Sequence, residues 1–138
     1  MTETFEAACH CGTVQFRVTL AGGLASARRC TCSYCTMRGA VAVSAALDGI
    51  SFLSGEDALT LYSFGTRTAR HFFCRRCGIY THHQRRSNPN QYGVNLACLK
   101  DLSIWDLGEI PVNDGINHPS DGSPARVSGV LRYEKTPT

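Results

Sequence analysis

Two short stretches, CHCG at residues 9–12 and CRRCG at residues 74–78, give the strongest indication of how this chain folds. In each stretch two cysteines stand close together and a glycine follows the second cysteine. Glycine readily adopts the positive φ that a tight turn around a metal ion requires. Four thiolates form a complete ligand set for a structural zinc. We therefore expect one zinc ion to be bound by Cys9, Cys11, Cys74 and Cys77.

This four-cysteine set would join two parts of the chain that lie more than sixty residues apart. Such a crosslink fixes long-range register, and coupled zinc binding contributes on the order of 10 kcal/mol of folding free energy. That is comparable to the net stability of a typical domain. A small protein of short strands buries only a modest core, so we expect this zinc to be structural. The alternative is that the two pairs are simply buried thiols.

Three further cysteines stand at residues 30, 32 and 35 in the sequence CTCSYC. Their spacing allows one knuckle-like turn to direct all three sulfurs at one ion. Three protein ligands and an open position are typical of a catalytic zinc, which polarises a carbonyl oxygen or binds an incoming thiolate. Three thiolates make zinc a poor Lewis acid, so we favour binding of the incoming thiolate over polarisation of the carbonyl oxygen. We expect Cys30, Cys32 and Cys35 to be the ligands and catalytic residues of this second site.

The eighth cysteine, Cys98, and the nearby histidines are alternative fourth ligands of the second site. In VNLACL, Cys98 alternates with Val94 and Leu96, so we expect it to be a small buried apolar residue on a strand face. His82 and His83 are adjacent on a predicted strand, and their rings should point to opposite faces. At most one of them could approach a given metal. A fourth protein ligand would make the second site inert.

Composition limits the compartment and the partners. The chain has 138 residues and eight cysteines, without a stretch that resembles a signal peptide or an apolar run long enough to cross a membrane. We expect one cytoplasmic domain over residues 1–138 whose thiols bind metal rather than form disulfides. The formal charge of +3 falls to about zero when two zinc ions bind seven thiolates. Charge therefore gives no support for general nucleic-acid binding, and the arginine pairs have little aromatic interleaving.

Alternating apolar residues predict a mainly β fold. Residues 13–20, TVQFRVTL, have the period of a half-buried strand, and no segment has the period of a long helix. Residues 57–61 and 102–110 fit either helix or strand. Residues 111–125 are rich in Asn, Asp, Gly, Ser and Pro and predict a loop. Further strands are predicted at residues 39–45, 59–65, 70–74, 78–83, 92–99 and 126–133.

The series CHCG, CTCSYC and FCRRCG resembles the glutathione-dependent formaldehyde-activating enzyme family, which also contains the centromere protein V domain. The resemblance runs from about Thr4 to Trp105, and all seven cysteines of the family pattern are present. It implies a β-tent (Mss4-like) fold of small antiparallel sheets organised around zinc. It also implies that the four-cysteine set binds a structural zinc and that the three-cysteine set binds a catalytic zinc.

The family's named activity joins formaldehyde to the sulfur of glutathione and is classed as a carbon-sulfur lyase in the reverse direction. The resemblance thus implies a zinc-dependent lyase-type enzyme for a small aldehyde and glutathione or a similar small thiol. The alternative is a noncatalytic, zinc-stabilised binding module, because one scaffold can carry different functions. Arginines near the cysteines could pair with glutathione carboxylates, or could simply solvate the surface and offset thiolate charge. These are Arg28, Arg29, Arg38, Arg75 and Arg76.

Overall fold

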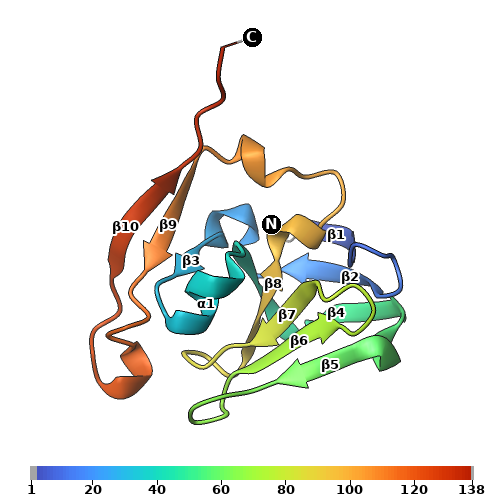
Figure 1. The fold of residues 1–138 in the computed structure, drawn as a ribbon, viewed down its shortest axis with the longest axis horizontal. Helices are drawn as coiled ribbons and strands as arrows, with labels where there is room; N and C mark the ends of the chain where they lie inside the picture. Colours follow the sequence, from blue (N-terminus) through green and yellow to red (C-terminus); the bar gives the residue numbers. More distant parts are fainter. Residues whose placement is uncertain (1–2, 138) are drawn as a thin grey trace.

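The computed structural model describes residues 3–137 and consists mainly of short strands in two sheets (Figure 1). Every neighbouring pair in the larger sheet is antiparallel. Its seven strands lie in the order β1 (Glu3–Ala8), β2 (Gln15–Leu20), β4 (Ala42–Ser54), β8 (Gln91–Asn95), β7 (Tyr80–Gln84), β6 (Arg70–Cys74) and β5 (Leu59–Tyr62). The predicted mainly β architecture of antiparallel sheets is confirmed.

The smaller sheet has the order β10 (Val127–Arg132), β9 (Glu109–Asn113) and β3 (Arg29–Cys30). In this sheet β9 pairs antiparallel with β10 and parallel with β3. A short helix, α1 (Ser33–Arg38), follows β3 and lies between the smaller sheet and strands β6 and β7 (Figure 1). Five 3₁₀ helices complete the described elements: η1 (Gly23–Ser26), η2 (Glu56–Ala58), η3 (Leu96–Cys98), η4 (Ile104–Asp106) and η5 (Pro119–Asp121).

Strand β2 shows how the sequence pattern produces the core. Phe16, Val18 and Leu20 are at most 1% exposed and alternate with residues that are exposed or partly exposed. Val43 from β4 and Val94 from β8 are fully buried in the same cluster. Burying such a side chain contributes about 1.5–3 kcal/mol, so these neighbouring strands hold the centre of the larger sheet together.

Strand β4 extends beyond the predicted strand at residues 39–45. It pairs with β8 over residues 42–46 and with β2 over residues 45–54, and its register against β2 shifts between Val18 and Leu20. At this irregularity a Cβ on Gly49 would lie 2.9 Å from the backbone oxygen of Thr19. Only glycine permits this close approach, so the strand bends without leaving the sheet.

The prediction of a strand over residues 92–99 is wrong at its end. Strand β8 stops at Asn95, whose side chain accepts a hydrogen bond from Ala97 N at 3.1 Å and begins η3. Cys98 is buried as expected, but it lies in this 3₁₀ helix and does not share a strand face with Val94. A side chain that caps its own backbone competes with the sheet, which the alternating apolar pattern does not reveal.

The predicted loop at residues 111–125 is also too long. Strand β9 continues to Asn113, because it is paired on both sides by β3 and β10. Neither β1 nor α1 is among the predicted elements, and a helix of six residues is too short to show a period. No helix within residues 3–137 has the length and apolar character needed to cross a membrane.

Candidate metal centres and the adjoining cavity

The two glycine-terminated stretches meet in one four-cysteine cluster. The cluster sulfurs lie within 4.8 Å of one another. Cys11 Sγ is 3.7 Å from Cys9 Sγ and 3.8 Å from Cys74 Sγ. A tetrahedron with zinc–sulfur bonds of about 2.3 Å has sulfurs separated by about 3.8 Å. The observed geometry fits a tetrahedral zinc bound by Cys9, Cys11, Cys74 and Cys77.

The local turns explain why these sulfurs converge. Gly12 and Gly78 have φ values of 78° and 77°, which lets the chain reverse directly after the second cysteine of each pair. Backbone N–H groups further along each turn donate to Cys9 Sγ at 3.3 Å and to Cys74 Sγ at 3.4 Å. A hydroxyl contact with Thr13 lowers the pKa of Cys11 to about 6. Burial raises the pKa of Cys9 to about 11, so the thiolate form of this ligand needs a cation close to the sulfurs.

The three-cysteine cluster lies where β3 passes into α1, and its sulfurs also lie within 4.8 Å of one another. Cys32 is the N-cap of α1, and its Sγ accepts the Cys35 N–H at 3.3 Å. Cys30 Sγ accepts the Cys32 N–H at 3.4 Å. The local backbone therefore directs two N–H groups at these sulfurs and supports negative charge on them.

The ionisation of the three thiols is strongly linked. The pKa of Cys32 is lowered far below its ordinary value, first by contact with the sulfurs of Cys30 and Cys35. Contacts with the sulfurs of Cys30, the larger effect, and of Cys32 raise the pKa of Cys35. Three sulfurs at this separation cannot all carry charge unless a cation lies among them. A set of three soft thiolates fits zinc, so this cluster could hold a second metal ion.

Neither Cys98 nor a histidine joins the three-cysteine cluster. Cys98 Sγ lies 3.6 Å from the backbone oxygen of Tyr80, and burial raises its pKa to about 12. Within residues 3–137, the candidate ligand atoms of this cluster come from three cysteines alone. The second cluster thus offers three candidate ligands within the described residues, whereas the first offers four.

The three-cysteine cluster lines a cavity of about 650 Å³. Arg28, Arg29 and Arg38 line it as well, whereas Arg75 and Arg76 do not. Its wall also includes Arg85, Arg86 and Arg126, which the sequence does not associate with the cysteines. Arg85 and Arg86 follow β7 and Arg126 precedes β10, so all three lie far from the three-cysteine cluster in the sequence. The adjacency of Arg85 and Arg86 is the one feature of residue order that could have pointed to any of them. Asp114 is the one acidic residue in the lining.

Arg38 connects the three-cysteine cluster to buried aromatic side chains. Its guanidinium lies 3.6 Å from Cys35 Sγ, 3.0 Å from His71 Nδ1 and 3.7 Å from the centre of the Tyr80 ring. Because a guanidinium only donates, His71 Nδ1 must accept and the ring proton must be on Nε2. Burial, and then the charge of Arg38, lower the pKa of His71 to about 4. His71 is therefore neutral near pH 7.

The adjacent histidines on β7 point to opposite faces of the sheet, as the sequence predicts. His82 lies in the core, 4.7 Å from the Phe72 ring and nearly parallel to it. His83 lines the cavity, and its Nδ1 lies 2.6 Å from Tyr80 Oη. Neither histidine belongs to a cysteine cluster.

The fold and the two cysteine clusters define a small, mainly β protein that could hold metal ions at two centres. The sequence model of the glutathione-dependent formaldehyde-activating enzymes matches residues 4–109. The chain belongs to this family. A protein from Rhodobacter sphaeroides with a known crystal structure is 57% identical to this chain in sequence. The TM-score between the two structures is 0.76. That match covers 78% of this chain and 98% of the other.

Proposed function

We propose that this chain is a zinc-dependent carbon-sulfur lyase-type enzyme. It adds a small aldehyde such as formaldehyde to the sulfur of glutathione or a similar small thiol, or removes it. The observation that carries the proposal is the three-cysteine cluster, which faces a cavity of about 650 Å³ and has no fourth ligand among residues 3–137. Family membership supports the same activity.

The two clusters have different roles in this proposal. Cys9, Cys11, Cys74 and Cys77 hold a structural zinc that ties the turn before β2 to the turn after β6. Cys30, Cys32 and Cys35 hold the catalytic zinc. A zinc ion with three protein ligands would supply an open position for a thiolate sulfur or an aldehyde oxygen.

The cavity is suited to a small anionic thiol. Its volume lies in the usual range for small-molecule sites, about 300–1,000 Å³. Six arginines line it with one aspartate, so it attracts negative charge, and arginine pairs well with carboxylates. Glutathione has two carboxylates, and formaldehyde is small enough to share the space with it. Both sheets contribute residues to the lining of this cavity, which supports treating residues 1–138 as one domain.

The reaction forms one carbon–sulfur bond. The thiol sulfur attacks the carbonyl carbon, the carbonyl π electrons move to oxygen, and the proton lost from sulfur is regained at that oxygen. Binding through the arginines would hold the thiol beside the three-cysteine cluster, so the two reactants meet in a defined orientation. The reverse reaction releases the aldehyde and the thiol.

The activity is tested by exchange NMR of formaldehyde and glutathione with the zinc-loaded protein. The wild type should form the adduct faster than the spontaneous rate, and Cys32→Ser should abolish the gain. Cys98→Ser is the matched control, because Cys98 lies outside both clusters. Equal rates for the wild type and Cys32→Ser would overturn the proposal. The protein would then be better explained as a noncatalytic, zinc-stabilised binding module.

Zinc content provides a second test. We expect two zinc ions per chain in the wild type and one in Cys32→Ser. Adding glutathione should perturb the second ion and leave the first in place, because four thiolates hold a metal more firmly than three. Wild-type protein that retains one zinc ion under all loading conditions would contradict a catalytic zinc.

A further inference from the structure

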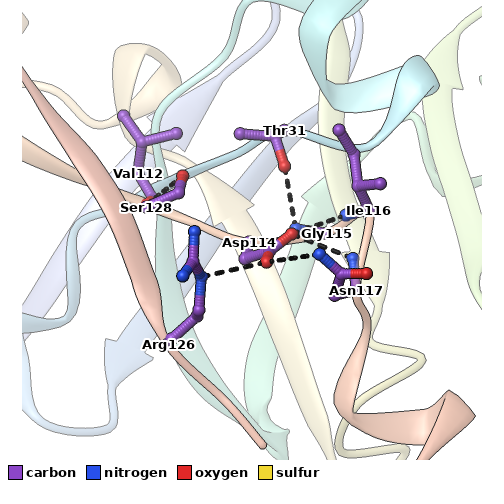
Figure 2. Close-up of polar contacts among 8 residues, drawn as sticks. All are labelled: Thr31, Val112, Asp114, Gly115, Ile116, Asn117, Arg126 and Ser128. Carbon is purple, nitrogen blue, oxygen red and sulfur yellow. Dashed lines mark hydrogen bonds and ion pairs between the residues drawn. The ribbon is translucent and has the colours of Figure 1, made fainter. Parts of the chain in front are cut away.

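The C-terminal hairpin of β9, residues 114–126 and β10 packs directly on the three-cysteine cluster. Gly115 N donates to Thr31 Oγ1 at 2.9 Å (Figure 2). Thr31 N in turn donates to Asn113 O at 3.1 Å. Beyond the first residue of β9, this hairpin lies outside the part of the chain that the family model matches. The hairpin therefore adds a wall to the cavity that the family match does not describe.

Asp114 organises this wall from a buried position. It is 6% exposed, and its Oδ1 accepts the backbone N–H groups of Ile116 at 3.0 Å and Asn117 at 2.9 Å. Its Oδ2 accepts Asn117 Nδ2 at 3.1 Å and Arg126 Nε at 3.1 Å. Figure 2 shows Asp114 between Arg126 on one side and the Ile116–Asn117 turn on the other. Both carboxylate oxygens are thus occupied by the hairpin itself.

This contact orients the guanidinium of Arg126. The interaction with Asp114 uses Nε, and the two Nη groups make no hydrogen bond within the described part of the chain. Arg126 lines the cavity, and its side chain is 64% exposed. A guanidinium with two adjacent donors in one plane is suited to a carboxylate.

The hairpin also contacts the segment of the cavity lining that follows β7. Asp121 forms an ion pair with Arg86, and Ser120 Oγ donates to the Arg86 carbonyl at 3.3 Å. Arg86 follows β7 in the larger sheet, whereas Arg126 precedes β10 in the smaller sheet. These contacts hold the hairpin, and with it Arg126, against the segment that follows β7.

We propose that Arg126, which contacts Asp114 through Nε, is a specificity-determining residue that binds a carboxylate of the thiol substrate. This rests on the proposed function and specifies the substrate end that is recognised. Among residues 3–137, the only acid that lines the cavity is Asp114, whose oxygens are occupied, so no carboxylate there is left for an ammonium group. The subsite therefore suits a carboxylate without a neighbouring ammonium, which in glutathione is the glycine end.

Steady-state kinetics with two thiols test this subsite. The thiols are glutathione and its ethyl ester at the glycine carboxylate. In the wild type the ester should have a KM about fivefold to tenfold higher than glutathione, which is the size expected for a partly exposed charged contact. Arg126→Gln should raise the KM for glutathione to that of the ester and change kcat by less than about twofold. Arg126→Lys should restore part of the difference, because it keeps the charge without the planar fork.

Arg132→Gln is the matched control. Arg132 is on β10, pairs with Glu109 on β9, and does not line the cavity. If Arg132→Gln raises the KM for glutathione as much as Arg126→Gln, the effect is one of hairpin stability and the proposal is overturned. Thermal melting of both variants checks that the hairpin remains folded.

Calorimetric titration of the zinc-loaded protein with glutathione alone separates this inference from the proposed function. Binding that weakens for the ester and for Arg126→Gln, without catalysis of adduct formation, would support the subsite and contradict the lyase activity. Catalysis that is equal for both thiols would support the activity and overturn the subsite. If the wild type neither binds glutathione nor accelerates adduct formation, both proposals fail.

Discussion

Gly115 lies against Cys30, so that a Cβ added to Gly115 would be 2.2 Å from Cys30 Sγ and 2.8 Å from Cys32 N. The site can therefore tolerate no side chain at this position. Gly115→Ala should force the hairpin away from β3 and disturb the three-cysteine cluster. We expect the zinc content to fall from two ions to one per chain, measured by metal analysis after dialysis.

The control for this change is Gly129→Ala on β10. A Cβ at Gly129 would meet nothing within 4 Å, and its φ is not positive. This variant should retain both zinc ions. If Gly115→Ala also retains both, the contact between the hairpin and Cys30 is not required for the second metal.

The four-cysteine cluster should determine whether the protein folds. Cys11→Ser removes one of four ligands, and coupled zinc binding contributes on the order of 10 kcal/mol, so the variant should be largely unfolded at room temperature. Far-ultraviolet circular dichroism and zinc content measure this. Cys98→Ala removes a buried thiol outside both clusters and should stay folded with two zinc ions. A folded, cooperatively melting Cys11→Ser protein would argue against a structural zinc.

His82 should make folding stability depend on pH. Burial lowers the pKa of His82 to about 4 in the folded protein, whereas an unfolded chain titrates histidine near about pH 6.5. The unfolded state therefore binds the proton first as pH falls. The stabilisation is fully present above about pH 6.5 and is lost progressively toward pH 4, by at most about 3 kcal/mol.

Denaturant titrations between pH 7 and pH 4.5 measure this dependence. His82→Phe retains an aromatic ring beside Phe72 and removes the titrating group. Its free energy of unfolding should fall less steeply over this range than that of the wild type. Loss of zinc in acid affects both proteins. The difference between their slopes of unfolding free energy against pH therefore measures the contribution of His82. Identical slopes would show that the ring is not buried as a neutral base.

Arg38→Gln should destabilise the packing of Arg38 against His71 and Tyr80. The change leaves His71 Nδ1 without its present donor and removes the charge above the Tyr80 ring. An unpaired buried acceptor costs about 1–3 kcal/mol, which chemical unfolding can resolve. Arg17→Gln, which affects an exposed arginine paired with Glu6, should cost less than about 1 kcal/mol. Equal losses for the two variants would contradict a special role for Arg38.

Several elements could be predicted from residue order because their cause is local. The alternation of Phe16, Val18 and Leu20 predicts β2, since burial on one face of a strand has a period of two. Segments whose cause is not local are harder to predict. Residues 111–113 of β9 are predicted as loop, but pairing with β3 and β10 makes them part of a strand. Asn95 ends β8 by capping η3, although the apolar pattern continues.

The grouping of the cysteines follows from residue order alone, because ligand spacing and the glycines that allow each turn lie within a few residues of one another. The surroundings of the three-cysteine cluster, by contrast, depend on long-range packing. The hydrogen bond from Gly115 to Thr31 joins residues 84 positions apart, and Arg126 reaches the cavity through Asp114. These contacts depend on the parallel pairing of β3 with β9, which is set by the packing of the whole chain and has no local signature.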